Sequence, residues 1–162
     1  MRRAWVLISL FLLVACGKDA YVEKYVTPGE VGWIADSIAT FSFEITDTTK
    51  PYRIEVRLRH DARYPFSNLY LFRSIHSIRG KEFSDTADMI LADQYGKWLG
   101  TGIGDVKTLV QPFGKGNLYF KRPGKYSIQL QHGMRQDTLR GIMDVGVALY
   151  KEDPKNNEQE RS

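Results

Sequence analysis

The feature that most constrains the fold is a strict alternation of apolar and polar side chains in several short segments. At positions 39–45 and 52–59, every second residue is apolar, and the residues between them are polar or charged. A period of two matches a β-strand, in which successive side chains point to opposite faces of a sheet. The pattern therefore predicts strands with one face on a hydrophobic core and the other in solvent.

The same alternation recurs late in the chain, at 126–131 and 143–149. The segment 68–72 is apolar at both parities, which predicts a central strand covered on both faces. No stretch of ten or more residues has a convincing helical period. Strands at regular spacing, separated by Gly, Pro and Asp, are typical of an antiparallel sandwich. We therefore predict an all-β fold, a single antiparallel β-sandwich spanning 31–150.

A Gly-x-Tyr sequence, Gly124 to Tyr126, leads into the alternating segment at 126–131. In Greek-key sandwiches, a tyrosine at such a corner donates its hydroxyl to backbone a few residues upstream. This signal is compatible with both an immunoglobulin-like and a jelly-roll topology.

The N-terminus has the features of a bacterial export signal. Arg2 and Arg3 precede an uncharged apolar run at 4–15. As a helix this run spans about 18 Å, whereas a bilayer core needs about 20 residues, so it is too short for a stable membrane span. Small residues then precede Cys16, and together these features match a secretory signal that ends in a lipobox. We predict that residues 1–15 are a signal peptide and that Cys16 is acylated.

Acylation gives the single cysteine a specific role. One cysteine forms neither an internal disulfide nor a zinc site with two or more Cys ligands. Two or more acyl chains on Cys16 anchor a protein durably in a membrane, and they consume the thiol. The residue after Cys16 is Gly17, not the aspartate that signals inner-membrane retention in many Gram-negative bacteria. The outer membrane is therefore favoured over the inner membrane.

The two ends of the mature chain differ from its middle. Residues 16–30 are predicted to be the lipidated cysteine and a tether, in which the Tyr and Val residues at 21–26 are candidates for a first short strand. Residues 151–162 contain no apolar side chain and are predicted to be a disordered polar tail.

The charge balance argues against nucleic acid. The chain has a formal charge of +4, and removal of Arg2 and Arg3 reduces it to +2. An exported protein also seldom meets its own chromosome, so we predict no nucleic-acid partner. A stripe of basic residues is expected to face outward as a solvated sheet surface, with a site for an anionic glycan, a lipid headgroup or a carboxylate as the alternative. The stripe consists of Arg53, Arg57, Arg59 and Arg63.

Catalytic and metal-binding motifs are absent from the sequence. The glycines at 96–104 precede a predicted strand, whereas phosphate loops precede a helix. The histidines lack clustered partners, and structural roles are predicted for His60, His76 and His132. The aspartates lack calcium-loop spacing, and turn or edge roles are predicted for Asp85, Asp88, Asp93 and Asp105. We predict no enzyme activity, no cofactor and no metal site.

Two tryptophans, Trp33 and Trp98, are predicted to anchor the core. The alternative is a carbohydrate-binding module at the cell envelope, in which Trp98 or Tyr95 beside the glycine-rich loop is exposed as a platform for sugar rings.

Several short sequences occur in an order that resembles the gliding-motility lipoprotein family GldH. They are Tyr-Pro-Phe-Ser-Asn-Leu-Tyr-Leu at 64–71, Leu-Ala-Asp at 91–93, Gly-Lys-Trp-Leu-Gly-Thr-Gly at 96–102, Gly-x-Tyr at 124–126, Gln-His-Gly-Met-Arg at 131–135 and Leu-x-Gly-Ile-x-Asp-Val-Gly at 139–146.

The resemblance covers nearly the whole mature domain and includes the lipobox. One departure is Gly133, where a bulkier residue is expected. The resemblance implies a small acylated, non-catalytic component of a cell-surface motility machinery, which is associated with a dedicated secretion system. It implies other envelope proteins of that machinery as partners, and it implies a defined role for one residue, Cys16, as the lipid attachment site.

Overall fold

A computed structural model describes residues 20–153 of the chain, so Cys16 and the predicted signal peptide lie outside the described residues. Over this range the protein consists of strands and connections, without helices. The strands are β1 (Val22–Val26), β2 (Trp33–Ile34), β3 (Ala39–Ile45), β4 (Tyr52–His60), β5 (Asn68–Ser77), β6 (Gly80–Ile90), β7 (Lys107–Pro112), β8 (Gly124–His132), β9 (Thr138–Leu139) and β10 (Ile142–Lys151).

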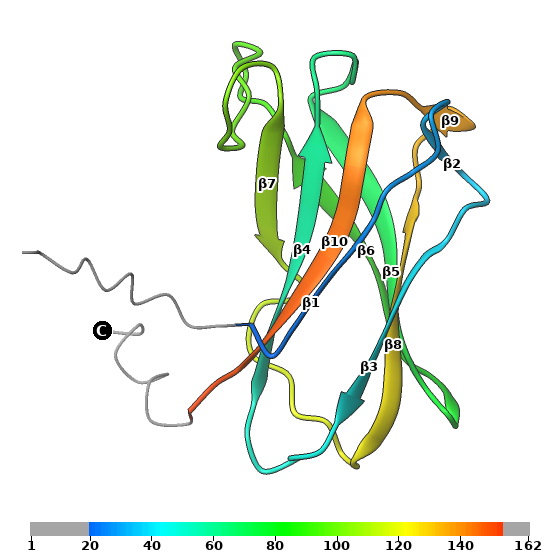
Figure 1. The fold of residues 1–162 in the computed structure, drawn as a ribbon, viewed down its shortest axis with the longest axis vertical. Helices are drawn as coiled ribbons and strands as arrows, with labels where there is room; N and C mark the ends of the chain where they lie inside the picture. Colours follow the sequence, from blue (N-terminus) through cyan, green and yellow to red (C-terminus); the bar gives the residue numbers. More distant parts are fainter. Residues whose placement is uncertain (1–19, 154–162) are drawn as a thin grey trace, which may run out of the picture.

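Two four-stranded antiparallel sheets pack face to face, as Figure 1 shows. We call the sheet with the order β1-β10-β4-β7 the first sheet and the sheet with the order β3-β8-β5-β6 the second sheet. The short strands β2 and β9 pair separately. The predicted all-β antiparallel sandwich is confirmed.

The pairing of the eight longer strands is nested. In chain order, the first pairs with the last (β1 with β10), the second with the seventh (β3 with β8), the third with the sixth (β4 with β7), and the fourth with the fifth (β5 with β6). A long antiparallel ribbon folded over on itself in this way is a jelly roll. The structure thereby decides between the two topologies that the sequence left open.

The core lies between the sheets and follows the alternation in the sequence. Phe41 on β3, Val56 and Leu58 on β4, Ile128 on β8 and Val147 on β10 all point inward and are buried. The predicted tyrosine corner is also present, since the Tyr126 hydroxyl donates to the Arg122 carbonyl oxygen at 2.9 Å.

The prediction for 68–72 is wrong in one respect. This segment begins β5, which is central in its sheet, but Tyr70 and Phe72 lie on the outer face with 44% and 50% of their surface exposed. Only one face of β5 is covered, because the second sheet has no further layer outside it among the described residues.

The sandwich extends beyond the predicted range of 31–150 at both ends. Residues 22–26, which fall within the predicted tether, form β1 and pair along β10. At the other end, Lys151 closes β10 and Glu152 is buried, with Arg53 bound to its carboxylate at 3.0 Å. The remainder of the predicted tail, 154–162, lies outside the described residues.

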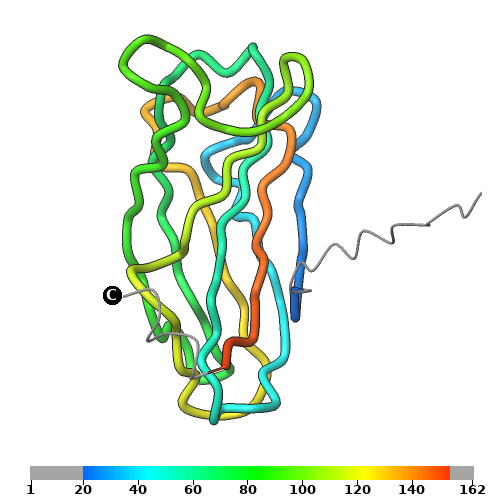
Figure 2. Tube along the Cα trace, turned by 90° about the vertical axis from the view of Figure 1, so that its left-hand side faces the viewer, coloured from blue at the N-terminus to red at the C-terminus, as the bar shows by residue number. Residues whose placement is uncertain are grey.

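The sandwich has two ends, which are visible in Figure 1 and again from the side in Figure 2. The proximal end, at the bottom of both views, carries the connections 46–51, 78–79 and 113–123. The distal end carries the connections 61–67 and 91–106.

Candidate functional site

The predicted basic stripe is present on the outer face of the first sheet, but its charges are paired. Arg57 contacts Glu23 at 2.6 Å, Glu55 at 3.2 Å and the Tyr150 hydroxyl at 2.5 Å. Burial opposes the charged form of Arg57, yet hydrogen bonds with Tyr25 and Glu55 raise its pKa.

The neighbouring arginines are occupied in the same way. Arg53 binds Glu55 and lies over the Tyr150 ring, 4.1 Å from its centroid. Arg59 contacts Asp144 at 3.3 Å. The fourth member, Arg63, lies at the distal end, where its guanidinium donates hydrogen bonds to the Asp61 carboxylate. The stripe is therefore a surface of internal ion pairs, as the solvated-face interpretation predicts.

The three histidines are separated from one another. His60 is fully buried, and its ring lies edge-on to Trp98 with centroids 4.5 Å apart. His132 is also buried, 3.1 Å from the Trp33 carbonyl oxygen. Burial lowers the pKa of both imidazoles. His76 is half-buried on the outer face of the second sheet, within 2.9 Å of the Ser74 hydroxyl.

The four aspartates occupy turns and an edge strand, as predicted. Asp93 accepts hydrogen bonds from the backbone amides of Tyr95 and Lys97, both at 2.9 Å. Asp85 and Asp88 lie on edge strand β6, where they bind Arg73 and Asn68. Asp105 is exposed at a turn in the 91–106 connection. In residues 20–153, no group of three His, Cys, Asp or Glu side chains is arranged to hold a metal ion.

The two aromatic residues proposed as a sugar platform differ in their exposure to solvent. Trp98 packs against the core beside His60, whereas Tyr95 is 85% exposed at a turn. Trp33 is buried, as predicted. The glycines of the loop serve its geometry, since a Cβ on Gly102 would lie 2.1 Å from the Val106 carbonyl oxygen.

A hollow lies at the proximal end of the sandwich, and we call it the proximal cleft. It has a volume of about 650 Å³ and lies between the β5–β6 turn and the connection from β7 to β8. Its basic lining residues are Arg79, Lys81, Lys121, Arg122 and Lys125. Its aromatic lining residues are Phe83, Tyr119, Phe120 and Tyr126.

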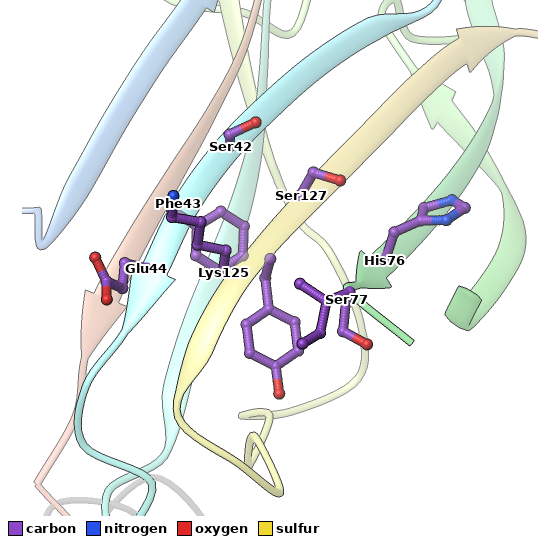
Figure 3. Close-up of a pocket in the computed structure, with 9 residues that line it drawn as sticks. Ser42, Phe43, Glu44, His76, Ser77, Lys125 and Ser127 are labelled. Carbon is purple, nitrogen blue, oxygen red and sulfur yellow. The ribbon is translucent and has the colours of Figure 1, made fainter. Parts of the chain in front are cut away.

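A second, shallower hollow of about 610 Å³ adjoins the cleft on the outer face of the second sheet. Figure 3 shows Ser42 and Glu44 on β3, Ser127 and Lys125 on β8, and His76 on β5 arranged around it. Lys125 lines both hollows, so the polar surface of the sheet continues into the cleft.

The sequence did not predict the proximal cleft. Its cations come from two segments, 79–81 and 121–125, that are about 40 residues apart in the chain, and the jelly-roll pairing brings them together. The one local signal is Lys121-Arg122 directly before the Gly-x-Tyr corner.

Comparisons with known proteins agree with one another. The sequence profile of the GldH lipoprotein family matches residues 20–149. A protein of Christiangramia forsetii, named gliding motility lipoprotein GldH homolog, is 33% identical over 154 residues, which cover 91% of this chain and 93% of that protein. The gliding motility lipoprotein GldH of Flavobacterium johnsoniae is 31% identical over 159 residues, which cover 91% of this chain and 95% of that protein.

The described residues contain no helix that is long and apolar enough to cross a bilayer. The profile match spans nearly the whole sandwich, from the residues before β1 to Leu149 in β10. The chain therefore belongs to the GldH lipoprotein family.

Proposed function

We propose that this protein is a membrane-anchored lipoprotein that acts as a non-catalytic component of a gliding-motility machinery and its associated secretion system. The observation that carries the proposal is the match to GldH lipoproteins over nearly the full chain, combined with a lipobox that ends at Cys16. The names of the two relatives supply the link to gliding.

Acyl chains on Cys16 hold the protein in the membrane, and the absence of a retention aspartate at position 17 leaves it free to reach the outer membrane. Its partners are other envelope proteins of the machinery. A non-catalytic role is supported by the way the polar groups are used: the two buried histidines pack on tryptophan rings, and the arginines of the first sheet are bound to carboxylates.

The test compares Cys16→Ala with the matched control Gly17→Ala in a gliding strain that lacks the native gene. We expect Cys16→Ala to lose incorporation of labelled fatty acid, to leave the outer-membrane fraction and to fail to restore spreading, because no acyl chain is attached. Gly17→Ala keeps all three. A Cys16→Ala protein that still fractionates with the outer membrane and supports movement contradicts the anchor.

A second candidate function is glycan binding on the outer face of the second sheet. Tyr70 and Phe72 are half-exposed there, next to the amide of Gln131 and the hydroxyl of Thr86, which lie opposite Phe72 on the two flanking strands. Exposed rings beside polar side chains, which include Asp88 opposite Tyr70, suit a sugar chain. This face replaces Trp98 as the platform, because the Trp98 ring packs on His60.

The control for this candidate is an exposed tyrosine elsewhere. In affinity electrophoresis through gels that contain cell-surface polysaccharide, Tyr70→Ala should migrate faster than the native protein, whereas Tyr95→Ala should be retarded as the native protein is. Equal retardation of all three proteins removes the candidate.

A further inference from the structure

The proximal cleft holds an excess of positive charge that the fold itself does not use. Glu82 is the single carboxylate among the residues that line it, against five cations, and it accepts a hydrogen bond from the Ser77 hydroxyl at 2.6 Å. Within residues 20–153, none of the ion pairs involves a cation of the cleft. All five cationic side chains belong to exposed residues.

Two other acidic groups at the proximal end are paired with other cations, whereas Glu44 lies opposite Lys125 on the neighbouring strand β3. Asp47 binds Lys151 at 2.7 Å, and Asp153 binds Lys50 at 2.5 Å. Unlike the arginines of the first sheet, the cations of the cleft are thus available to a ligand. Charge complementarity requires that ligand to be an anion.

Apolar side chains project beside this charge. Ile78, at the tip of the β5–β6 turn, is 88% exposed, and Tyr119, in the connection from β7 to β8, is 61% exposed. An exposed aliphatic tip and an amphipathic tyrosine next to Lys and Arg are the combination found at membrane–water interfaces.

The start of the described chain lies at the same end. The Tyr21 ring contacts Tyr52 with centroids 5.7 Å apart, Tyr52 contacts Phe120 at 5.4 Å, and Phe120 contacts Tyr126 at 4.7 Å. Phe120 and Tyr126 line the cleft, so an unbroken series of rings joins Tyr21 to it. Even fully extended, the chain from Cys16 to Tyr21 spans at most about 18 Å.

We propose that the proximal cleft docks on the membrane that holds Cys16 and binds the phosphate groups of anionic lipid headgroups there, with Ile78 and Tyr119 at the interface. The inference rests on the proposed lipid anchor. It adds an orientation: the proximal end faces the bilayer, and the distal end and outer sheet faces are left for protein partners. A short tether raises the local concentration of headgroups at the cleft, so weak individual contacts suffice.

The test uses the full lipidated protein reconstituted in two kinds of vesicle, one of phosphatidylcholine alone and one that also contains phosphatidylglycerol. Mass spectrometry measures how fast acetic anhydride acetylates each lysine. Lys121 and Lys125 should react about fivefold more slowly on the anionic vesicles, the factor expected for a cation held at an anionic surface. Lys97, exposed at the distal end, should react equally on both. High salt should abolish the difference, because it screens exposed charges.

A double variant tests the cleft directly. Lys121→Gln with Arg122→Gln should reduce the protection of Lys125, whereas the distal control Lys97→Gln with Arg135→Gln should leave it unchanged. Equal acetylation on both vesicles overturns the proposal. Protection by soluble glycerophosphate or by a soluble acidic polysaccharide as strong as that by anionic vesicles also overturns it. Failure of the anchor is seen separately, as a native protein that does not float with phosphatidylcholine vesicles.

Discussion

The two ends of the sandwich use polar side chains in opposite ways. At the distal end, His60 is buried against Trp98, and Asp61 and Asp93 bind the loops to which they belong. At the proximal end, the cations that line the cleft have no ion-pair partner among the described residues and lie in solvent beside exposed Ile78. These distal polar groups therefore support the fold, and the cations of the proximal cleft are free for a ligand.

The largest expected effect on stability comes from a distal glycine. Gly141 has φ of +80°, and a Cβ there would lie 2.3 Å from the Tyr64 backbone nitrogen. Gly141→Val should lower the free energy of unfolding by about 3 kcal/mol or more, through both strain and the backbone clash. Urea unfolding followed by circular dichroism measures the change.

The matched control for Gly141→Val is Gly114→Val at the proximal end. A Cβ on Gly114 meets nothing within 4 Å, so this change should stay within about 0.5 kcal/mol. Similar losses from both substitutions would break the distinction between the two ends.

The next effect is a loss of stability in acid that originates at the distal end. Burial lowers the pKa of His60 and His132 in the folded protein, and their buried Nε2 and Nδ1 atoms, respectively, have no hydrogen-bond partner among the described residues. Below about pH 6.5, the unfolded chain binds protons at these histidines more readily than the folded chain. The stabilisation is therefore complete above that pH and is lost as the pH falls through the folded-state values.

Thermal unfolding across this pH range measures the effect. In a variant with His60→Phe and His132→Phe, the melting temperature should fall less between neutral pH and about pH 5. An unchanged fall would place the acid sensitivity elsewhere in the protein.

A smaller effect on the free energy of unfolding is expected at Tyr126, a proximal residue whose hydroxyl group supports the fold. The Tyr126 hydroxyl donates to the Arg122 carbonyl oxygen at 2.9 Å, so Tyr126→Phe should cost about 1 kcal/mol of unfolding free energy. Tyr119→Phe, at an exposed ring of the same cleft, should change it by less than about 0.5 kcal/mol. Chemical denaturation of the two variants side by side tests the difference.

The smallest effect on stability is expected from the cations of the cleft. Lys121→Gln with Arg122→Gln should leave the free energy of unfolding within about 0.5 kcal/mol of the native value, because neither side chain makes an ion pair in the described residues. A loss of more than about 1 kcal/mol by calorimetry would mean that these charges support the fold rather than a ligand.

Sequence patterns correctly predicted the strands that have one face on the core and the other in solvent. The segments at 39–45 and 52–59 became β3 and β4, because their apolar sides face the core and their polar sides face solvent. The same reasoning failed at β5. The aromatic residues Tyr70 and Phe72 led to the prediction of a strand covered on both faces, but both rings face solvent. Composition alone does not separate a covered aromatic from one that faces solvent.

Contacts between distant segments set the limit of sequence-based inference. The pairing of β1 with β10 turned part of the predicted tether into sheet, and it depends on residues more than 100 positions apart. The proximal cleft also depends on the fold, because Arg79 and Lys121 are far apart in the chain and line the same cleft only after the strands have paired. By contrast, the lipobox is local, so Cys16 was identifiable from the sequence, and its acylation stays a prediction.

The central claim is that the proximal end faces the membrane, and one distance measurement tests it most directly. Ile78 and Ile103 are 88% and 96% exposed, at the proximal and distal ends respectively. Because an acylated Cys16 has no free thiol, Ile78→Cys and Ile103→Cys each introduce a unique site for a fluorophore. On anionic vesicles with nitroxide-labelled headgroups, strong quenching at position 78 and little at position 103 is predicted. Equal quenching at both positions, or stronger quenching at 103, would contradict the account.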